Sequence, residues 1–306
     1  MSVLFPALSF LARPAVRGVL LMIIACIAFS SMWVFIRYAS ASLHALQIVF
    51  FRNAIGLLVL LPMVLANPGL LVWSRWRLHA ARGTSGFIAT MGTFYAVANV
   101  PLAIALSINY TAPLFATLGA VIFLRERIRL RRIIGVVAGF IGMLIVVRPG
   151  ALPLTPGVLA ALASAIATAF AVIAIRRLVG SDDPRAVAVW SFIFNLGPSF
   201  AMALFVWRSP PPETWPLLLG VGIAAAIGQL SLSRAFTLGE ASMLLPFDFV
   251  RFALVTLAGI TLFSERYDIF TLAGGSLILA STIYLAVREA QVARDTRAAS
   301  LPQNPS

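Results

Sequence analysis

Two opposite charges lie three residues apart in an apolar stretch near the end of the sequence. Asp248 and Arg251 interrupt the segment from Ala241 to Phe263, which carries no other charge. On a helix, residues at this spacing share one face, so a carboxylate and a guanidinium there are within pairing reach. A charge at membrane depth costs at least about 2.5 kcal/mol, so such residues normally face a partner or a cavity. We therefore take this pair as the first candidate for orienting a bound substrate.

Two prolines predict breaks in the helices that carry polar side chains. Pro246 cannot donate a hydrogen bond to the carbonyl of Ser242, so the helix should kink or break just before the charged pair. Pro113 likewise leaves the carbonyl of Asn109 without its helical donor, unless it only kinks a packed helix. Irregular backbone beside polar groups at membrane depth is typical of transporter binding sites. Both prolines are therefore candidate hinges.

The composition indicates a membrane protein that crosses the bilayer several times. Of the 306 residues, 61% are hydrophobic and 11% are charged, whereas soluble domains contain about 25% charged residues. The net charge is +13, but the arginines fall in short clusters between apolar spans. That pattern is typical of cytoplasmic membrane loops, so we expect a lipid bilayer around the chain and no nucleic-acid partner.

Ten apolar stretches, each long enough for a helix, predict an all-α fold with ten transmembrane helices. The expected spans are Val16 to Tyr38, His44 to Ala66, Leu78 to Val100, Pro101 to Leu124, Arg132 to Val147, Pro156 to Val179, Ala186 to Trp207, Thr214 to Leu238, Ala241 to Phe263 and Ile269 to Val287. The polar segment 289–306 is expected to be a disordered cytoplasmic tail.

The distribution of arginines predicts the orientation of the chain. If the N-terminus is cytoplasmic, 17 arginines fall on the cytoplasmic side and four on the opposite side. Positive residues accumulate on the cytoplasmic side of membrane proteins. We therefore expect both termini in the cytoplasm.

The two halves of the sequence resemble each other. The segment from Ile122 to Arg148 is similar to the segment from Leu262 to Arg288, and Glu126 matches Glu265 there. A separate match, between the stretches that begin at Phe50 and Phe192, pairs Asn53 with Asn195. Because five helices per half is an odd number, the second copy must enter the membrane from the opposite side. We expect two inverted five-helix repeats, at 16–148 and 156–288, with a site between them near the membrane midplane.

These features together resemble the EamA family of the drug/metabolite transporter superfamily. The resemblance is carried by the ten-span plan, the sequence FFRN at residues 50–53, the run Pro101-Leu102-Ala103, and the repeat endings at Glu126 and Glu265. It implies transport of a small polar or amphipathic metabolite across the bacterial inner membrane, in either direction. The PFDF-x-R stretch is similar to a subgroup that includes uptake systems for S-adenosylmethionine and riboflavin. This similarity implies an amino-acid-like, S-adenosylmethionine-like or flavin-like substrate.

Polar residues within the spans supply further candidate contacts for a substrate. Arg52 could either bind a ligand or extend outward along its aliphatic stem. Asn109 matches Asp248 by the repeat offset, so the two should face each other on symmetry-related helices. Gln229 shares a helix face with Ser233, four residues on, and this face could border the cavity.

Aromatic and acidic residues are less informative. Trp33 and Tyr110 could line a pocket for a planar substrate, although lipid contact suits most aromatic residues in such a chain. Asn53 and Asn195 suggest a hydrogen bond between two helices. Glu265 lies at a span end beside an arginine, where an interfacial anchor is the expected role.

The other function classes have little support in the sequence. An enzyme would need converging nucleophiles, acids or metal ligands, but the only histidines, His44 and His79, are isolated. No GxxxxGK[ST] loop is present for nucleotide-driven pumping. We predict a secondary transporter that works by alternating access, with no catalytic residue, metal or cofactor. A receptor or assembly protein, and the pairing of two copies into a homodimer, stay open as alternatives.

Overall fold

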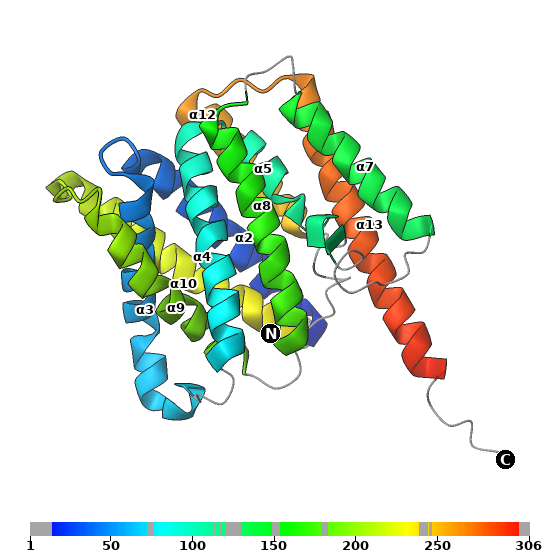
Figure 1. The fold of residues 1–306 in the computed structure, drawn as a ribbon, viewed down its shortest axis with the longest axis horizontal. Coiled ribbons are helices and arrows are strands. Elements are labelled where there is room, and N and C mark those ends of the chain that lie inside the picture. Colours follow the sequence, from blue (N-terminus) through cyan, green and yellow to red (C-terminus); the bar gives the residue numbers. More distant parts are fainter. Residues whose placement is uncertain are drawn as a thin grey trace, which may run out of the picture.

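The chain is entirely helical in the part that the structure describes. The computed structural model describes residues 14–71, 76–112, 114–116, 118–119, 130–148, 154–178, 183–238, 244 and 247–299. These residues form ten α-helices and two short 3-10 helices, with no strand among them (Figure 1). The α-helices are α2 (Pro14–Ala39), α3 (Ala45–Ala66), α4 (Trp76–Asn99), α5 (Leu102–Asn109), α7 (Leu130–Val147), α8 (Pro156–Leu178), α9 (Pro184–Leu204), α10 (Trp215–Leu238), α12 (Asp248–Phe263) and α13 (Ile269–Ala299). The prediction of an all-α fold is confirmed for these residues.

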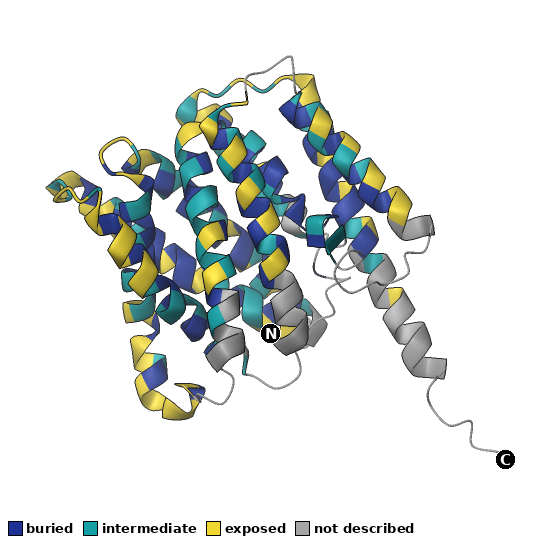
Figure 2. Cartoon of the chain, in the orientation of Figure 1, coloured by how far each residue is buried: buried dark blue, intermediate teal, exposed yellow. Residues whose placement is uncertain are grey.

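The outer surface of the helices is apolar. Four helical segments are long and apolar enough to cross a bilayer, and they are Val16–Ala39, Ala45–Ala66, Arg185–Leu204 and Pro212–Leu238. Large aliphatic side chains face outward, such as Leu65 with 70% of its surface exposed and Ile134 with 57%. Figure 2 shows such exposed positions interspersed with buried ones along the helices. Lipid tails can cover a surface of this kind, which in water would favour aggregation.

The expected continuous span from Pro101 to Leu124 is wrong in detail, because the helix is interrupted. α5 ends at Asn109, and Tyr110 and Thr111 form a turn before the helix resumes. The N–H of Thr111 donates to the carbonyl of Ile108 at 3.0 Å, which tightens the last turn of α5. Pro113 lies outside the described residues. The break still falls where a proline at 113 removes the donor for the Asn109 carbonyl.

The end of the predicted tail needs correction, whereas the start of the span that carries the charged pair is not tested. The described helix with this pair is α12, Asp248–Phe263, while Ala241 and Pro246 lie outside the described residues. The segment after 288 was expected to be disordered, but α13 continues as a helix to Ala299. The reason is that residues 289–299 include four alanines and two arginines, residue types that favour helix and allow a membrane helix to extend beyond the bilayer.

The most extensive helix contacts keep their pattern when the first five helices are exchanged with the last five. α2 packs along α10, and the exchanged pair, α8 and α4, packs in the same way. The pairs α3 with α9, α5 with α12, and α7 with α13 each map onto themselves under this exchange. Figure 1 shows α7 and α13 side by side along one edge of the bundle. Each helix of one half therefore contacts a helix of the other half. α3, α5 and α7 contact their own counterparts, whereas α2 contacts α10 and α4 contacts α8.

Glycines allow two of these pairs to approach closely. A Cβ on Gly142 of α7 would lie 2.8 Å from the carbonyl oxygen of Gly274, and a Cβ on Gly274 of α13 would lie 2.7 Å from that of Gly142. On α4, a Cβ on Gly92 would lie 2.6 Å from the carbonyl oxygen of Ala160 in α8. Small residues at these positions let the backbones make contact, as is common between membrane helices.

Candidate functional site

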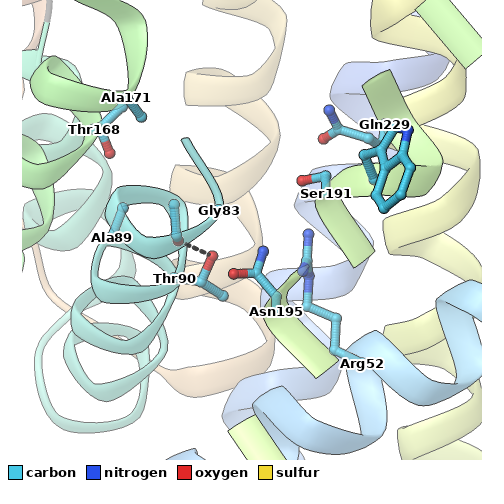
Figure 3. Close-up of a pocket in the computed structure, with 11 residues that line it drawn as sticks. Arg52, Gly83, Ala89, Thr90, Thr168, Ala171, Ser191, Asn195 and Gln229 are labelled. Carbon is cyan, nitrogen blue, oxygen red and sulfur yellow. Dashed lines mark hydrogen bonds between the residues drawn. The ribbon is translucent and has the colours of Figure 1, made fainter. Parts of the chain in front are cut away.

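A cavity of about 250 Å³ lies among α3, α4, α8, α9 and α10. Its wall combines small apolar residues with polar side chains, as Figure 3 shows. The lining residues are Arg52, Gly83, Gly86, Ala89, Thr90, Thr168, Ala171, Trp190, Ser191, Asn195 and Gln229. Among these described lining residues there is one cation and no carboxylate. A site with hydroxyls, amides and a single guanidinium can bind a polar solute by hydrogen bonds and charge.

Arg52 is the charged group of this cavity. It lies about two turns after the start of α3, and only 9% of its surface is exposed. Its Nη1 donates to Asn53 Oδ1 at 2.7 Å, and its guanidinium lies 5.1 Å from the centre of the Phe192 ring. The Nε atom is buried and donates to no described group. Arg52 therefore points inward, and the alternative that it extends to the surface is excluded by its burial.

Asn53 holds α3 against α9 and so fixes the position of Arg52. Its Nδ2 donates to the carbonyl of Asn195 at 3.4 Å and to Ser199 Oγ at 3.2 Å. The predicted hydrogen bond between the two matched asparagine positions is confirmed. The side chain of Asn195 lines the cavity, and its Oδ1 is buried without a hydrogen-bond partner among the described residues.

Glycines on α3 and α4 shape the neighbourhood of Arg52. A Cβ on Gly56 would lie 2.5 Å from the Phe192 ring, so glycine lets this ring pack beside α3 and beneath the guanidinium. A Cβ on Gly86 of α4 would meet no atom within 4 Å, because Gly86 faces the open cavity. The small residues of α4 therefore create the space that the polar side chains surround.

Asn109 supports the wall of the cavity and does not line it. Its Nδ2 donates to Thr93 Oγ1 at 3.4 Å, and Thr93 is 2.6 Å from Ser164 Oγ. Ser164 Oγ donates in turn to the carbonyl of Ala89, a lining residue, at 2.7 Å. Since the Ser164 hydroxyl is used as a donor there, Thr93 must donate to Ser164 and accept from Asn109. This chain joins α5, α4 and α8.

Arg251, one member of the predicted pair at 248 and 251, is not among the described residues that line the cavity. The Arg251 guanidinium is 5.1 Å from the Trp33 ring and 5.5 Å from the Phe29 ring, both on α2. Trp33 is buried, with 1% of its surface exposed. Asp248 is the first residue of α12, but its side chain is outside the described set, so its pairing with Arg251 stays a prediction. The structure places Arg251 and Trp33 together and gives them no position in the cavity wall.

Of the two other predicted substrate contacts, Gln229 on α10 lines the cavity, and Tyr110 is not among the described lining residues. Tyr110 is buried in the turn after α5, where its carbonyl accepts from Thr282 Oγ1 at 3.1 Å and its ring lies 6.4 Å from that of Phe252. Sequence reasoning missed Thr90, Thr168 and Ser191, because hydroxyl side chains are common in apolar helices and carry no distinctive spacing.

One end of the bundle is closed by polar contacts between helix ends. Arg37 at the end of α2 lies 3.3 Å from Glu265, and it donates to the carbonyls of Val97 and Val100 at 2.7 and 3.0 Å. Glu265 also accepts from the N–H of Leu102 at 2.9 Å and from the Tyr267 hydroxyl. Burial raises the pKa of Tyr267, and the adjacent carboxylate adds to this effect.

Two further contacts lie at the same end. Ser42 and Thr214 hydroxyls are 3.0 Å apart, and Gln47 exchanges hydrogen bonds with the backbone of Arg208 at 2.5 and 3.3 Å. The cavity extends away from this end: Gly83 lies near the start of α4, whose other end carries the contacts to Arg37. The cavity is therefore separated from the closed end by the packed core between them.

Comparisons with known proteins agree with this architecture. The sequence matches the EamA-like transporter family over residues 16–148 and 155–287. The Pseudopaline exporter CntI of Pseudomonas aeruginosa is 31% identical over 88% of this chain and 95% of its own length. The S-adenosylmethionine uptake transporter of Rickettsia felis is 27% identical over 83% of this chain and 86% of its own. The riboflavin transporter of Vibrio cholerae is 27% identical over 92% of this chain and 96% of its own length.

A solved crystal structure supports the fold alone. It superposes with a TM-score of 0.62 at 19% identity, covering 90% of this chain and 98% of that one. The family match extends over most of the sequence, and its relatives are named as transporters. The chain therefore belongs to the EamA-like transporter family, and it is a membrane transporter of metabolites and not an enzyme.

Proposed function

We propose that this protein is a secondary transporter of the bacterial inner membrane that moves a small polar or amphipathic metabolite by alternating access. The substrate binds in the cavity around Arg52, Asn195 and Gln229. The observation that carries the proposal is a buried guanidinium facing a cavity of about 250 Å³ within a helix bundle of this family. A buried charge of this kind is costly unless it serves a ligand or a partner.

The helix packing supports two inverted five-helix repeats that rock against each other. The most extensive contacts, α2 with α10 and α4 with α8, exchange with each other when the first five helices are swapped with the last five, as such a relationship requires. Ten described α-helices, with arginines enriched on alternate connections, agree with ten spans and cytoplasmic termini. In this arrangement the end closed by Arg37 and Glu265 faces the periplasm, and the cavity lies toward the cytoplasmic half.

The charged pair on α12 has a second role in this scheme. Asp248 and Arg251, with Trp33 beside the guanidinium, orient the substrate or the coupling ion during passage between the halves. Asn109 and Tyr110 flank the break after α5, and Pro113 and Pro246 act as the hinges of this movement. Relatives are named for both uptake and export, so the direction of transport is not inherited from the family name.

Counterflow into liposomes tests the proposal. Purified protein is reconstituted with each of several unlabelled metabolites inside, including S-adenosylmethionine and riboflavin, and uptake of the labelled solute is followed. We expect accumulation of at least one solute, and at least a tenfold lower rate for Arg52→Gln. Arg208→Gln is the matched control, because Arg208 contacts Gln47 through its backbone only. A monodisperse Arg52→Gln protein with full transport would contradict the assignment of this cavity.

A further inference from the structure

We propose that the cavity selects solutes that carry a carboxylate next to an N–H donor, with Arg52 binding the carboxylate and Asn195 Oδ1 accepting the N–H. This inference rests on the proposed function, since it names the substrate class of the same site. Two atoms motivate it, Nε of Arg52 and Oδ1 of Asn195. Both are buried, both belong to side chains that line the cavity, and neither has a hydrogen-bond partner among the described residues.

Arg52 lacks a counter-charge among the described residues that surround it. Its contacts are a neutral amide, Asn53 Oδ1 at 2.7 Å, and the face of the Phe192 ring at 5.1 Å. A cation–π contact stabilises a guanidinium by less than the cost of leaving its charge unpaired in a low-dielectric interior. A carboxylate offers the planar, bidentate geometry that a guanidinium fork matches best.

Asn195 supplies the complementary acceptor. Only 3% of the surface of Asn195 is exposed. Its backbone carbonyl already accepts a hydrogen bond from Asn53 Nδ2. Figure 3 shows the side chains of Arg52 and Asn195 next to each other on the same side of the cavity, with Ser191 close by. A buried amide oxygen without a donor destabilises the protein, because it has lost its hydrogen bonds to water. A ligand N–H beside its carboxylate would satisfy both protein groups at once.

The charge of the cavity favours a carboxylate over a phosphate. One guanidinium balances one negative charge, and the described lining residues include no second cation. A phosphate monoester carries about −1.5 to −2 charges at pH 7, so it would bring an uncompensated negative charge into the membrane interior. If Arg52 serves only to pack against Phe192, a carboxylate and a phosphate should bind equally weakly.

Small probes of each chemistry separate these cases. Purified full-length protein in detergent is titrated with sodium propionate, propionamide or sodium phosphate at constant ionic strength. Binding is read from thermal stability and from tryptophan fluorescence, because Trp190 lines the cavity. We expect a saturable rise in Tm with propionate but not with propionamide or phosphate. N-acetylglycine, which adds a neutral N–H donor next to the carboxylate, should bind at least threefold more tightly than propionate. A wild-type protein that responds equally to propionate and propionamide, or best to phosphate, would overturn the proposal.

Variants then locate the carboxylate. Arg52→Gln should raise the apparent Kd for propionate at least tenfold, whereas Arg208→Gln should leave it unchanged. If Arg52→Gln fails to fold, Arg52→Lys keeps the charge but loses the bidentate fork, and it should bind propionate several-fold more weakly. Unchanged propionate binding in a folded Arg52 variant would reject the site. The outcomes are separable from transport: carboxylate binding without counterflow would defeat the proposed function, and counterflow that carboxylates do not inhibit would defeat this inference.

Discussion

Arg37 Nη2 lies 3.3 Å from Glu265 Oε1, and the two residues come from opposite halves of the sequence. Together they join the ends of α2, α4, α5 and α12, because Arg37 also donates to two carbonyls at the end of α4 and Glu265 accepts from the N–H of Leu102. The Glu265 side chain is 7% exposed. Glu265 accepts from three donors at this helix junction, and we expect these contacts, called the latch below, to keep this end closed until they separate.

Breaking the latch should favour the state that is open at this end. Glu265→Gln removes the charge that holds Arg37 while keeping the size of the side chain. In a Cys26→Ala background with Ser191→Cys as a reporter in the cavity, we expect an impermeant thiol reagent added from the periplasm to label faster by at least threefold. The unfolding free energy should fall by about 1–3 kcal/mol, as for a buried hydrogen-bonded charge that loses its partner.

Gln47→Ala provides a comparison for the latch variant. It removes the contact to the Arg208 backbone at the same end but leaves the ion pair in place. We expect a smaller change in labelling than for Glu265→Gln. Equal labelling of the wild type and Glu265→Gln from the periplasm would show that the ion pair does not control access.

Filling the cavity from α4 should block transport without loss of stability. A Cβ on Gly86 would meet no atom within 4 Å, so Gly86→Leu can start a side chain there that extends into the cavity. Replacing a helical glycine should favour the fold by about 0.5–1 kcal/mol. We expect counterflow to drop at least tenfold while Tm is unchanged or raised. Gly197→Leu is the matched control, because Gly197 is also unobstructed but is exposed on α9 outside the cavity.

The apolar stretches and the arginine pattern were sufficient to predict the helices, because burial in a bilayer leaves few alternatives to a helix. They also identified Arg52, Asn53 and Gln229 as residues within the membrane. They could not predict that Arg52 and Arg251 lie in different surroundings, since this depends on how α3, α9 and α12 rotate as they pack. The latch was missed for the same reason: Arg37 and Glu265 are 228 positions apart and were assigned to span ends independently.

Asn53 should position Arg52, and its replacement separates stability from binding. Asn53→Ala removes the acceptor for Arg52 Nη1 and the donor to α9, so we expect a loss of about 1–3 kcal/mol in unfolding free energy together with weaker transport. Asn53→Asp also loses the donor to the Asn195 carbonyl but gains a carboxylate that pairs with Arg52, so its stability should fall less than that of Asn53→Ala. It should still abolish transport, because the guanidinium is then neutralised within the protein. Full transport by Asn53→Asp would argue against a role for the Arg52 charge.

Cysteine labelling tests the orientation of the chain. In a Cys26→Ala background, Arg129→Cys should react with an impermeant reagent only from the cytoplasm, and Pro153→Cys only from the periplasm. The expectation rests on the excess of arginines, 17 against four, on alternate connections. Labelling of Arg129→Cys in intact spheroplasts would reverse the assignment and would place the Arg37–Glu265 latch on the cytoplasmic side.

The last prediction concerns the charged pair on α12. Arg251 lies against Trp33 and Phe29, and its Nε is buried without a hydrogen-bond partner among the described residues. If Asp248 and Arg251 serve only the fold, then removing one charge strands the other and should lower stability. In that case the double replacement by apolar residues of similar volume, Asp248→Leu with Arg251→Met, should restore both folding and transport.

A role in substrate passage gives a different pattern for the same variants. Asp248→Asn and Arg251→Gln should then stay in the membrane as monodisperse protein yet lose counterflow, and the double apolar variant should fold without regaining it. Phe29→Leu serves as the comparison, because it weakens the aromatic contact to Arg251 but leaves Trp33 and both charges. We expect it to retain most of the flux. Expression, Tm and counterflow measured together decide the matter, since a double variant that transports normally would leave the pair with a structural role alone.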